Sequence, residues 1–310
     1  MRVTIVGNPV SDPTGAAVTA VVAGCRSRGW QHVLLEWTTM AEPGGPQARK
    51  AIADGADLVV VCGGDGTVRE VAGALAGTGV ALGIVPRGTA NLFARNLRLP
   101  HRSLARSIEV ALDGPARDVD LGRARWGGPE RPDGQGAFVV LAGVGHDART
   151  IELVRPALKK RIQWRAYFVP AIATLGEPLI PMRVRLDDGP PEERSLWCLL
   201  AGSVGRIPLG IEVLPGARVD DGLLHVAEVG PAHVVGWVPI ALKGLVHWSG
   251  DVPGLEYHAA RLVRVETEDP VTVHVDGDEH PGVDWLEARI EPGVLHVHLP
   301  PAREAAAAPQ

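Results

Sequence analysis

Short apolar runs alternate with helix-like segments along the first third of the chain. Runs of four or five apolar residues between helices are typical of parallel strands that are buried on both faces of a sheet. This part of the chain therefore predicts an α/β domain with a doubly wound, mostly parallel sheet. The expected strands are 3–6, 32–36, 58–61 and 81–85, and the expected helices are 16–28, 47–54 and 68–76.

The pattern changes after about residue 121, where the segment "RWGGPERPDGQG" is rich in glycine, proline and charge. Strand-like segments then dominate, interrupted by two long helix candidates near 149–175 and 231–248, so we expect a second, β-rich and mostly antiparallel domain. The expected strands are 137–142, 182–186, 196–201, 223–228, 262–266 and 271–275. The expected domains are 1–121 and 122–293, with a strand near 294–300 that could return to the first domain and a disordered tail at 301–310.

Composition excludes several classes of protein. The 310 residues suffice for two domains, and the formal charge of −5 argues against nucleic acid as the main partner. The three cysteines show neither metal-ligand spacing nor a disulfide framework, which fits a reducing, cytoplasmic compartment. No apolar run approaches the ~18 residues of a spanning helix, and the start "MRVTIVGNPV" does not have the pattern of a signal peptide.

The first candidate site is "VVVCGGDGTVREV", residues 59–71, in which a buried strand ends at a glycine turn and a helix follows. Such turns let phosphate approach the main chain, and ligands of open α/β sheets bind beyond the carboxyl ends of the strands. Neither G-x-x-x-x-G-K-[ST] nor G-x-G-x-x-G fits, because Arg69 stands where the latter requires glycine. Asp65 would repel phosphate, so we expect it to lie beside a metal ion or to accept hydrogen bonds. The alternative is that it caps a helix starting at Thr67.

A second glycine turn, "GIVPRGTANLFARN" at 83–96, repeats the order of strand, polar loop and helix. Two neighbouring strand ends with polar loops would form a cleft. Thr89 and Asn91 could donate hydrogen bonds to phosphate, and Arg87 and Arg95 add positive charge. The alternative for the arginines is a solvated helix face.

These two segments together resemble the diacylglycerol-kinase catalytic domain family, which includes bacterial lipid kinases and, more distantly, sphingosine and ceramide kinases. The resemblance continues in order over about residues 1–300. It is carried further by "GNPVSDPTG" near the start, "DVDLGRA" (118–124), "LAGVGHDA" (141–148), "GIEVLPGARVDDGLLHV" (210–226) and "VHVDGDEHPG" (273–282).

The resemblance implies a nucleotide-binding domain, a β-rich lipid-substrate domain, ATP in the cleft between them, and transfer of the γ-phosphoryl to a lipid hydroxyl. The implied base lies in an Asp-Gly-Glu motif, here Asp276, Gly277 and Asp278, with Asp278 as proton acceptor and Asp276 orienting it or the metal. The implied Mg²⁺ site is Asp221 with carbonyl oxygens of Arg218 and Leu223. The implied nucleotide contacts are Thr39 (preferred over Thr38), Gly63, Gly64, Asp65, Gly66, Thr67, Gly88, Thr89 and Asn91.

Two departures from the family pattern concern the metal and the base. Leu92 stands where many relatives have aspartate, so a role in holding magnesium and water must be weaker or fall to Asp65 and Asp120. Asp278 replaces glutamate and shortens the carboxylate's reach. Glu279 is the rival base if the turn is shifted by one residue. The alternative for the whole motif is an ordinary Asp-Gly hairpin turn.

The expected reaction is diacylglycerol to phosphatidic acid. Open alternatives are another lipid or sphingoid alcohol as acceptor, an NAD kinase, and a non-catalytic relative that binds lipid or nucleotide. The basic, aromatic stretch 149–176 suits an anionic membrane surface, which predicts peripheral membrane association; the alternative is a solvated basic helix face. A homodimer is possible. That stretch combines Arg155, Lys159, Lys160, Arg161 and Arg165 with Trp164, Tyr167 and Phe168.

Overall fold

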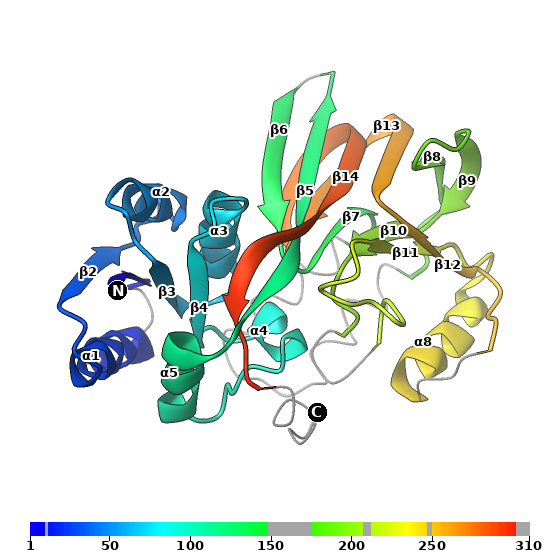
Figure 1. Cartoon of the computed structure of the whole chain (residues 1–310). Coiled ribbons are helices and arrows are strands. Elements are labelled where there is room, and N and C mark those ends of the chain that lie inside the picture. Colours follow the sequence, from blue (N-terminus) through cyan, green and yellow to red (C-terminus); the bar gives the residue numbers. More distant parts are fainter. Residues whose placement is uncertain (10–11, 130, 148–174, 207–211, 247–249, 302–310) are drawn as a thin grey trace. The chain divides into compact units, whose positions relative to one another are not determined.

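A computed structural model describes residues 1–9, 12–129, 131–147, 175–206, 212–246 and 250–301. The chain divides into two units (Figure 1). Unit 1 comprises Met1–Leu121, Val219–Asp221 and the residues from Glu291 onward. Unit 2 comprises Gly122–Arg218 and Gly222–Ile290. The two long strands β5 (Ala116–Gly128) and β14 (Asp278–His298) each have residues in both units.

Unit 1 is built on a parallel sheet, as the sequence predicts. Its strand order is β14–β4–β3–β1–β2, and each neighbouring pair is parallel. The central strand β3 is buried along its whole length because both of its faces are covered. Besides the end of β14, the strands are β1 (Arg2–Gly7), β2 (His32–Trp37), β3 (Leu58–Gly63) and β4 (Ala81–Pro86).

Helices lie on both faces of this sheet, with α1 and α5 on one side and α2 and α3 on the other (Figure 1). Apolar residues of α1, α5, β1 and β3 form one core cluster. The helices are α1 (Asp12–Ser27), α2 (Gly45–Ala53), α3 (Asp65–Leu75), the short α4 (Leu92–Asn96) and α5 (Leu104–Asp113). Helix α5 was not among the helices expected from the sequence, although Ser103 caps it by accepting a hydrogen bond from the N–H of Arg106 at 3.3 Å.

Unit 2 is β-rich, and its main sheet has the strand order β12–β11–β10–β7–β13–β14 with antiparallel neighbours. The hairpin of β8 and β9 adds to β13, and β5 pairs with β6. Inward-facing apolar residues of these strands form its core. The remaining strands are β6 (Arg131–Phe138), β7 (Leu141–Gly145), β8 (Ile180–Leu186), β9 (Glu192–Leu196), β10 (Cys198–Gly202), β11 (Leu224–Val229), β12 (Leu255–Ala260) and β13 (Leu262–Val275).

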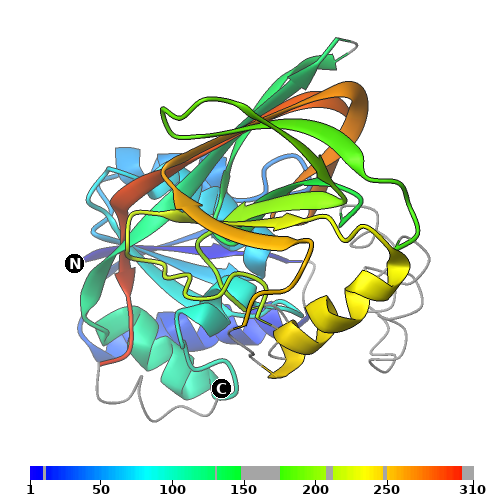
Figure 2. The same ribbon diagram turned by 90° about the vertical axis from the view of Figure 1, so that its right-hand side faces the viewer.

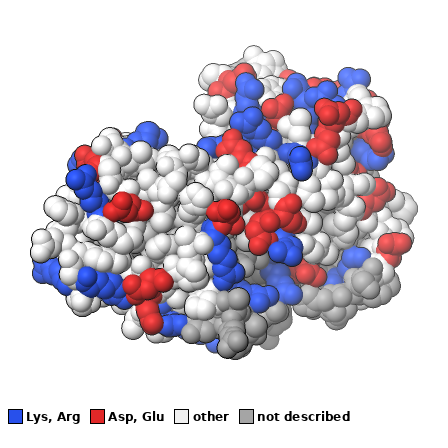
Figure 3. Space-filling model, in the orientation of Figure 1, with Lys and Arg blue, Asp and Glu red and all other residues white. Residues whose placement is uncertain are grey.

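Of the two long helices expected in the second domain, the one near 231–248 is present as the 3₁₀ helix η2 (Val234–Gly236) and α8 (Trp237–Val246). The other, near 149–175, lies almost entirely outside the described residues, as does the basic stretch within it. No helix in the described parts of the chain is long and apolar enough to cross a bilayer. Lysine and arginine are mixed with acidic residues over the face drawn in Figure 3, in keeping with the net charge.

Candidate active site

The two glycine turns lie side by side at the carboxyl ends of β3 and β4. The N–H of Arg87 donates to the carbonyl of Gly63 at 2.8 Å, which extends the β3–β4 pairing into the turns. A Cβ atom on Gly88 would stand 2.6 Å from the Cα of Gly64, and one on Gly64 would stand 3.1 Å from the Cα of Gly88. The close packing of the two main chains therefore requires glycine at position 88 and leaves little room for a Cβ atom at position 64.

Asp65 connects the two turns through its side chain. Its Oδ1 accepts a hydrogen bond from the N–H of Phe93 at 3.2 Å, in the first turn of α4. Burial raises the pKa of the Asp65 carboxyl, and the backbone N–H groups of Leu92, Phe93 and Asn91 oppose that rise. Asp65 is the first residue of α3, and no side-chain bond caps that helix. The expected alternative, a cap for a helix starting at Thr67, is therefore wrong: Asp65 caps the helix after the other turn.

Asn91 shapes the second turn. It adopts left-handed backbone geometry, with φ of 47°. Its Oδ1 accepts from the N–H of Gly88 at 2.9 Å, and its Nδ2 donates to the carbonyl of the same residue at 2.8 Å. The amide expected to contact phosphate thus closes the loop from which Thr89 projects.

The other residues expected to contact the nucleotide lie at the same edge of the sheet. Gly66 and Thr89 are exposed, whereas Thr67 is buried against Gly63. Thr38 is buried after β2, and Thr39 is exposed with its Oγ1 accepting from the N–H of Glu42 at 3.0 Å. Exposed groups along this edge can approach a phosphate chain, and glycine main chain and threonine hydroxyl groups are suitable donors.

Asp276 and Gly277 form the two-residue turn between β13 and β14, with φ of 49° and 81°. Positive φ at both positions is typical of an Asp-Gly hairpin turn. The Asp276 carboxylate accepts from the N–H groups of Val139 (2.9 Å), Val140 (2.9 Å) and Leu141 (3.0 Å). These contacts fix a neighbouring segment of unit 2. They show a structural role for Asp276, and its expected role of orienting a base or metal stays a prediction.

Asp278 is the first residue of β14 and is half-buried. It pairs with Val275, and its neighbour Glu279 pairs with His274. Successive strand residues point to opposite faces, so the carboxylates of Asp278 and Glu279 lie on different sides of the strand. A substrate on one side of β14 can meet only one of the two.

His274 was not among the site residues expected from the sequence, although it lies within the segment 273–282. Its Nε2 lies 2.5 Å from Oδ2 of Asp147, and its side chain is buried. A Cβ atom on Gly143 would lie 2.3 Å from that nitrogen, so glycine makes room for the pair. The signal in the sequence was the run Gly143-x-Gly145-x-Asp147, which places a carboxylate just after two glycines.

The expected magnesium residues lie in and beside the turn before β11. Asp221 is half-buried, Arg218 is exposed, and Gly222 between Asp221 and Leu223 has φ of 72°. One carboxylate and two carbonyl oxygens form the all-oxygen donor set that Mg²⁺ prefers, so the residue types fit the ion. Asp120, considered above as a substitute, accepts from the N–H of Gly293 at 2.8 Å.

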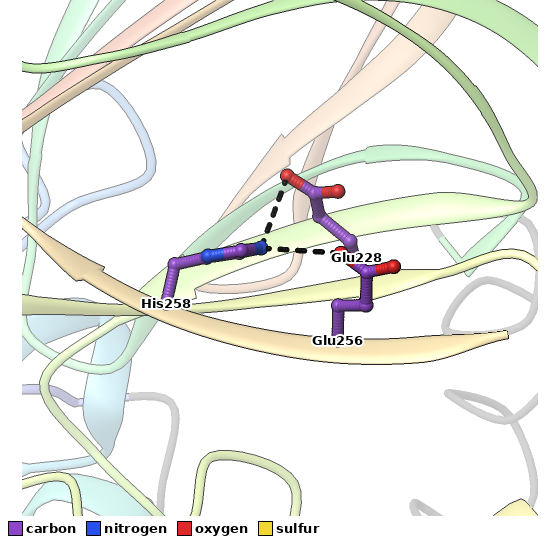
Figure 4. A group of neighbouring side chains, drawn as sticks. All are labelled: Glu228, Glu256 and His258. Carbon is purple, nitrogen blue, oxygen red and sulfur yellow. Dashed lines mark ion pairs between the residues drawn. The ribbon is translucent and has the colours of Figure 1, made fainter. Parts of the chain in front are cut away.

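A different group has metal-ligand spacing among the described residues: Glu228 of β11 with Glu256 and His258 of β12 (Figure 4). The Nε2 of His258 lies 3.7 Å from an oxygen of each glutamate. Arg194 already supplies a cation, with its Nε 3.1 Å from Oε2 of Glu228. We interpret the group as an ion-pair network, and it contains none of the residues expected in the site.

Comparisons with known proteins show the family to which the chain belongs. The diacylglycerol kinase catalytic domain family matches residues 2–124, and the YegS C-terminal NAD kinase beta sandwich-like domain family matches residues 139–299. A Pseudomonas fluorescens protein named "Probable lipid kinase YegS-like" is 31% identical over 291 residues, covering 91% of this chain and 90% of that protein. The chain belongs to the diacylglycerol kinase family. A diacylglycerol kinase of Mycobacterium tuberculosis is 30% identical, covering 89% of this chain and 88% of that protein.

Solved structures show the same fold. A diacylglycerol kinase from Bacillus anthracis matches with a TM-score of 0.68 at 18% identity, covering 97% of each chain. Yeast NADH kinase complexed with NADH matches with a TM-score of 0.54 at 10% identity, covering 98% of this chain and 85% of that one. The diacylglycerol kinase family thus shares its architecture with NAD kinases, and membership makes this chain a lipid kinase-type enzyme that uses ATP.

Proposed function

We propose that the protein transfers the γ-phosphoryl group of ATP to the free hydroxyl of diacylglycerol, giving phosphatidic acid and ADP. The observation that carries this proposal is the contact of the two glycine turns, with Gly64 against Gly88 and Asp65 bonded to Phe93. Through this contact the main chains of the two turns form one continuous surface, next to the exposed residues Gly66 and Thr89. Such a surface of backbone N–H groups suits the binding of a polyphosphate. Family membership supports the lipid acceptor.

Phosphoryl transfer depends mainly on positioning and charge neutralisation. The residues proposed to position ATP are Thr39, the turn Gly63–Thr67, and Gly88, Thr89 and Asn91. In this assignment Asp65 and Asn91 hold the turns in shape, whereas Gly66 and Thr89 face the phosphates. Arg87 and Arg95 add positive charge near the second turn.

Mg²⁺ would be held by the Asp221 carboxylate with the carbonyl oxygens of Arg218 and Leu223. When bound, such an ion neutralises part of the phosphate charge. We assign the ion to the turn before β11 because the family resemblance points to these residues, and Leu92 supplies no carboxylate in the second glycine turn.

Asp278 is the proposed general base. The hydroxyl oxygen forms the new bond to the γ-phosphorus, the bond from that phosphorus to the β–γ bridging oxygen breaks, and the hydroxyl proton passes to the Asp278 carboxylate. ADP leaves with the electron pair of the broken bond. We assign proton transfer to Asp278 because it fills the position of the glutamate in the family motif, whereas Asp276 accepts hydrogen bonds from three backbone N–H groups.

The proposed acceptor resides in a membrane, so we also propose that the protein associates peripherally with anionic bilayers. The basic, aromatic residues of 149–176 support this from sequence alone, because cationic side chains are attracted to anionic headgroups.

The experiment is a radiolabelled-ATP assay of the purified protein with Mg²⁺ and a panel of acceptors: diacylglycerol, ceramide, a sphingoid base and NAD. Labelled phosphatidic acid with little transfer to the others is the expected result. Transfer to NAD in preference to every lipid would assign the protein to the other activity found on this fold. No transfer to any acceptor, by protein that binds ATP, would favour a binding role.

A further inference from the structure

One stretch of unit 2 presents large apolar side chains to solvent. Of the nine large hydrophobic side chains exposed among the described residues, four lie within η2 and α8. Val235 is 78% exposed, and the other three are at least half exposed. We call these four residues, Val234, Val235, Val238 and Leu242, the α8 face.

The four positions form one stripe. Val238 follows Val234 and Val235 by four and three residues, and Leu242 follows Val238 by four. Residues three or four apart lie on the same side of a helix, so the stripe runs along its length. The exposed Ala241 also lies within it.

The opposite side of α8 is firmly packed, so the exposure does not come from a loosely attached helix. The Nε1 of Trp237 donates to the carbonyl of Leu175 at 3.1 Å, and its ring meets that of Trp197 at 4.8 Å. Ile240 packs on the same apolar cluster. Figure 2, in which α8 faces the viewer, shows the helix alongside the strands of unit 2.

This stretch is also uncharged on its outer side. Residues 230–250 contain no aspartate or glutamate, and Lys243 is their single lysine or arginine. Lys243 is buried, donates to the carbonyl of Gly250, and lies 5.5 Å from the ring centre of Tyr257. A water-facing helix normally presents charged or polar residues outward. The α8 face instead offers apolar groups with no charge to repel an anionic surface.

We propose that the α8 face docks on the lipid bilayer, with its side chains at the boundary between headgroups and acyl chains. The inference rests on the proposed function, because that acceptor is a membrane lipid. A second copy of the chain suits the face less well, because four such side chains supply far less than the roughly 800 Å² per partner of a stable interface. A helix lying in the membrane interface buries its apolar face by only about 5–10 Å, so a narrow apolar stripe is enough for contact.

The test compares the parent with the triple variant Val235→Ser, Val238→Ser and Leu242→Ser. The matched control removes three exposed apolar side chains from unit 1: Leu34→Ser, Leu35→Ser and Met40→Ser. Binding is measured by flotation with phosphatidylcholine vesicles that contain no diacylglycerol, with ATP absent, so the result does not depend on catalysis. Melting temperatures show that all three proteins are folded.

The parent and the control should float with the vesicles, and the α8 variant should bind at least about tenfold more weakly, since each buried apolar group adds to partitioning. Binding through this face should persist in ~1 M salt, where the Debye length is about 3 Å. Equal binding of the α8 variant and the parent would overturn the inference. So would a parent dimer, seen by sedimentation velocity without lipid, that the α8 variant converts to monomer.

Activity separates this inference from the proposed function. With a short-chain diacylglycerol dissolved as monomers, the α8 variant should turn over like the parent; with long-chain diacylglycerol in vesicles it should be slower. A parent that phosphorylates neither substrate contradicts the proposed function, whereas the flotation result alone decides whether the α8 face binds lipid.

Discussion

The carboxylate of Asp65 accepts its hydrogen bond from the N–H of Phe93, 28 residues further along the chain. The acid at the start of one helix therefore holds the start of the next, and the two glycine turns before these helices are kept in register. This relationship explains how an acid can stand inside the proposed phosphate loop: its carboxylate is directed toward a backbone donor.

Asp65→Ala should lower both stability and activity. It removes the acceptor for the first turn of α4, and loss of a cap costs about 0.5–2 kcal/mol. For a chain of this size we expect a fall in melting temperature of only a few degrees, with a much larger loss of lipid phosphorylation because the turns lose their register. Calorimetry and the radiolabelled assay measure the two effects. A fully active variant would contradict the phosphate-loop assignment.

Asp65→Asn should change the pH dependence of stability. Burial raises the pKa of this carboxyl in the folded chain, so folding favours the protonated form and ionisation above that pKa costs stability. Near neutral pH the asparagine variant should melt at the same temperature as the parent or higher. The difference should close as the pH falls through the raised pKa of Asp65. A variant that is less stable than the parent at neutral pH would show that the charged hydrogen bonds outweigh burial.

Gly66→Ala should weaken ATP binding without unfolding the chain, because no atom within 4 Å obstructs a Cβ at this position. Gly88→Ala should weaken binding and also lower the melting temperature, since its Cβ would meet the main chain of Gly64. Gly15→Ala, in α1 and equally unobstructed, is the control and should leave ATP affinity unchanged. Titration calorimetry gives the affinities. If Gly66→Ala binds ATP as tightly as the parent, this turn does not contact the nucleotide.

Asp278→Asn should reduce kcat by about 10²–10⁴, the usual contribution of a general base, while ATP affinity stays nearly constant. Asp278→Glu should retain activity because the family's usual residue is restored. Glu279→Gln is the comparison, since its side chain lies on the other face of β14. If Glu279→Gln abolishes turnover while Asp278→Asn does not, the base has been assigned to the wrong side of the strand.

Asp276→Ala should destabilise the protein more than it harms the chemistry. Three N–H groups in a buried segment lose their acceptor, and each unsatisfied buried donor costs about 1–3 kcal/mol. Asp276→Asn keeps an acceptor oxygen and a residue type that tolerates positive φ, so it should lose less. Denaturant unfolding ranks the two variants. If Asp276→Ala has the stability of the parent but no turnover, Asp276 acts in catalysis and its main role is not structural.

Much of the fold was predictable because it follows from local patterns. The fully apolar run of β3 identifies a buried parallel strand, and the glycines after it mark the turn. The partners of Asp65 and Asp276 were not predictable, because each is fixed by tertiary contacts with segments 28 and about 136 residues away. The exposure of the α8 face was equally unpredictable, because the sequence of an apolar helix does not reveal which of its sides is covered.

The path of β14 determines how much of the chain must be synthesised before the sheet of unit 1 is complete. Its end pairs with β4 in unit 1, through His296 beside Ala81, and the N–H of Gly77 donates to the carbonyl of Val294. These residues are synthesised after the whole of unit 2. A nascent chain ending at residue 121 therefore has β4 as an open edge, and unit 1 cannot complete its sheet until the residues of unit 2 have been made. Truncation at the apparent domain boundary should give an aggregation-prone fragment, and a circular permutant that joins the β14 strand directly to unit 1 should not.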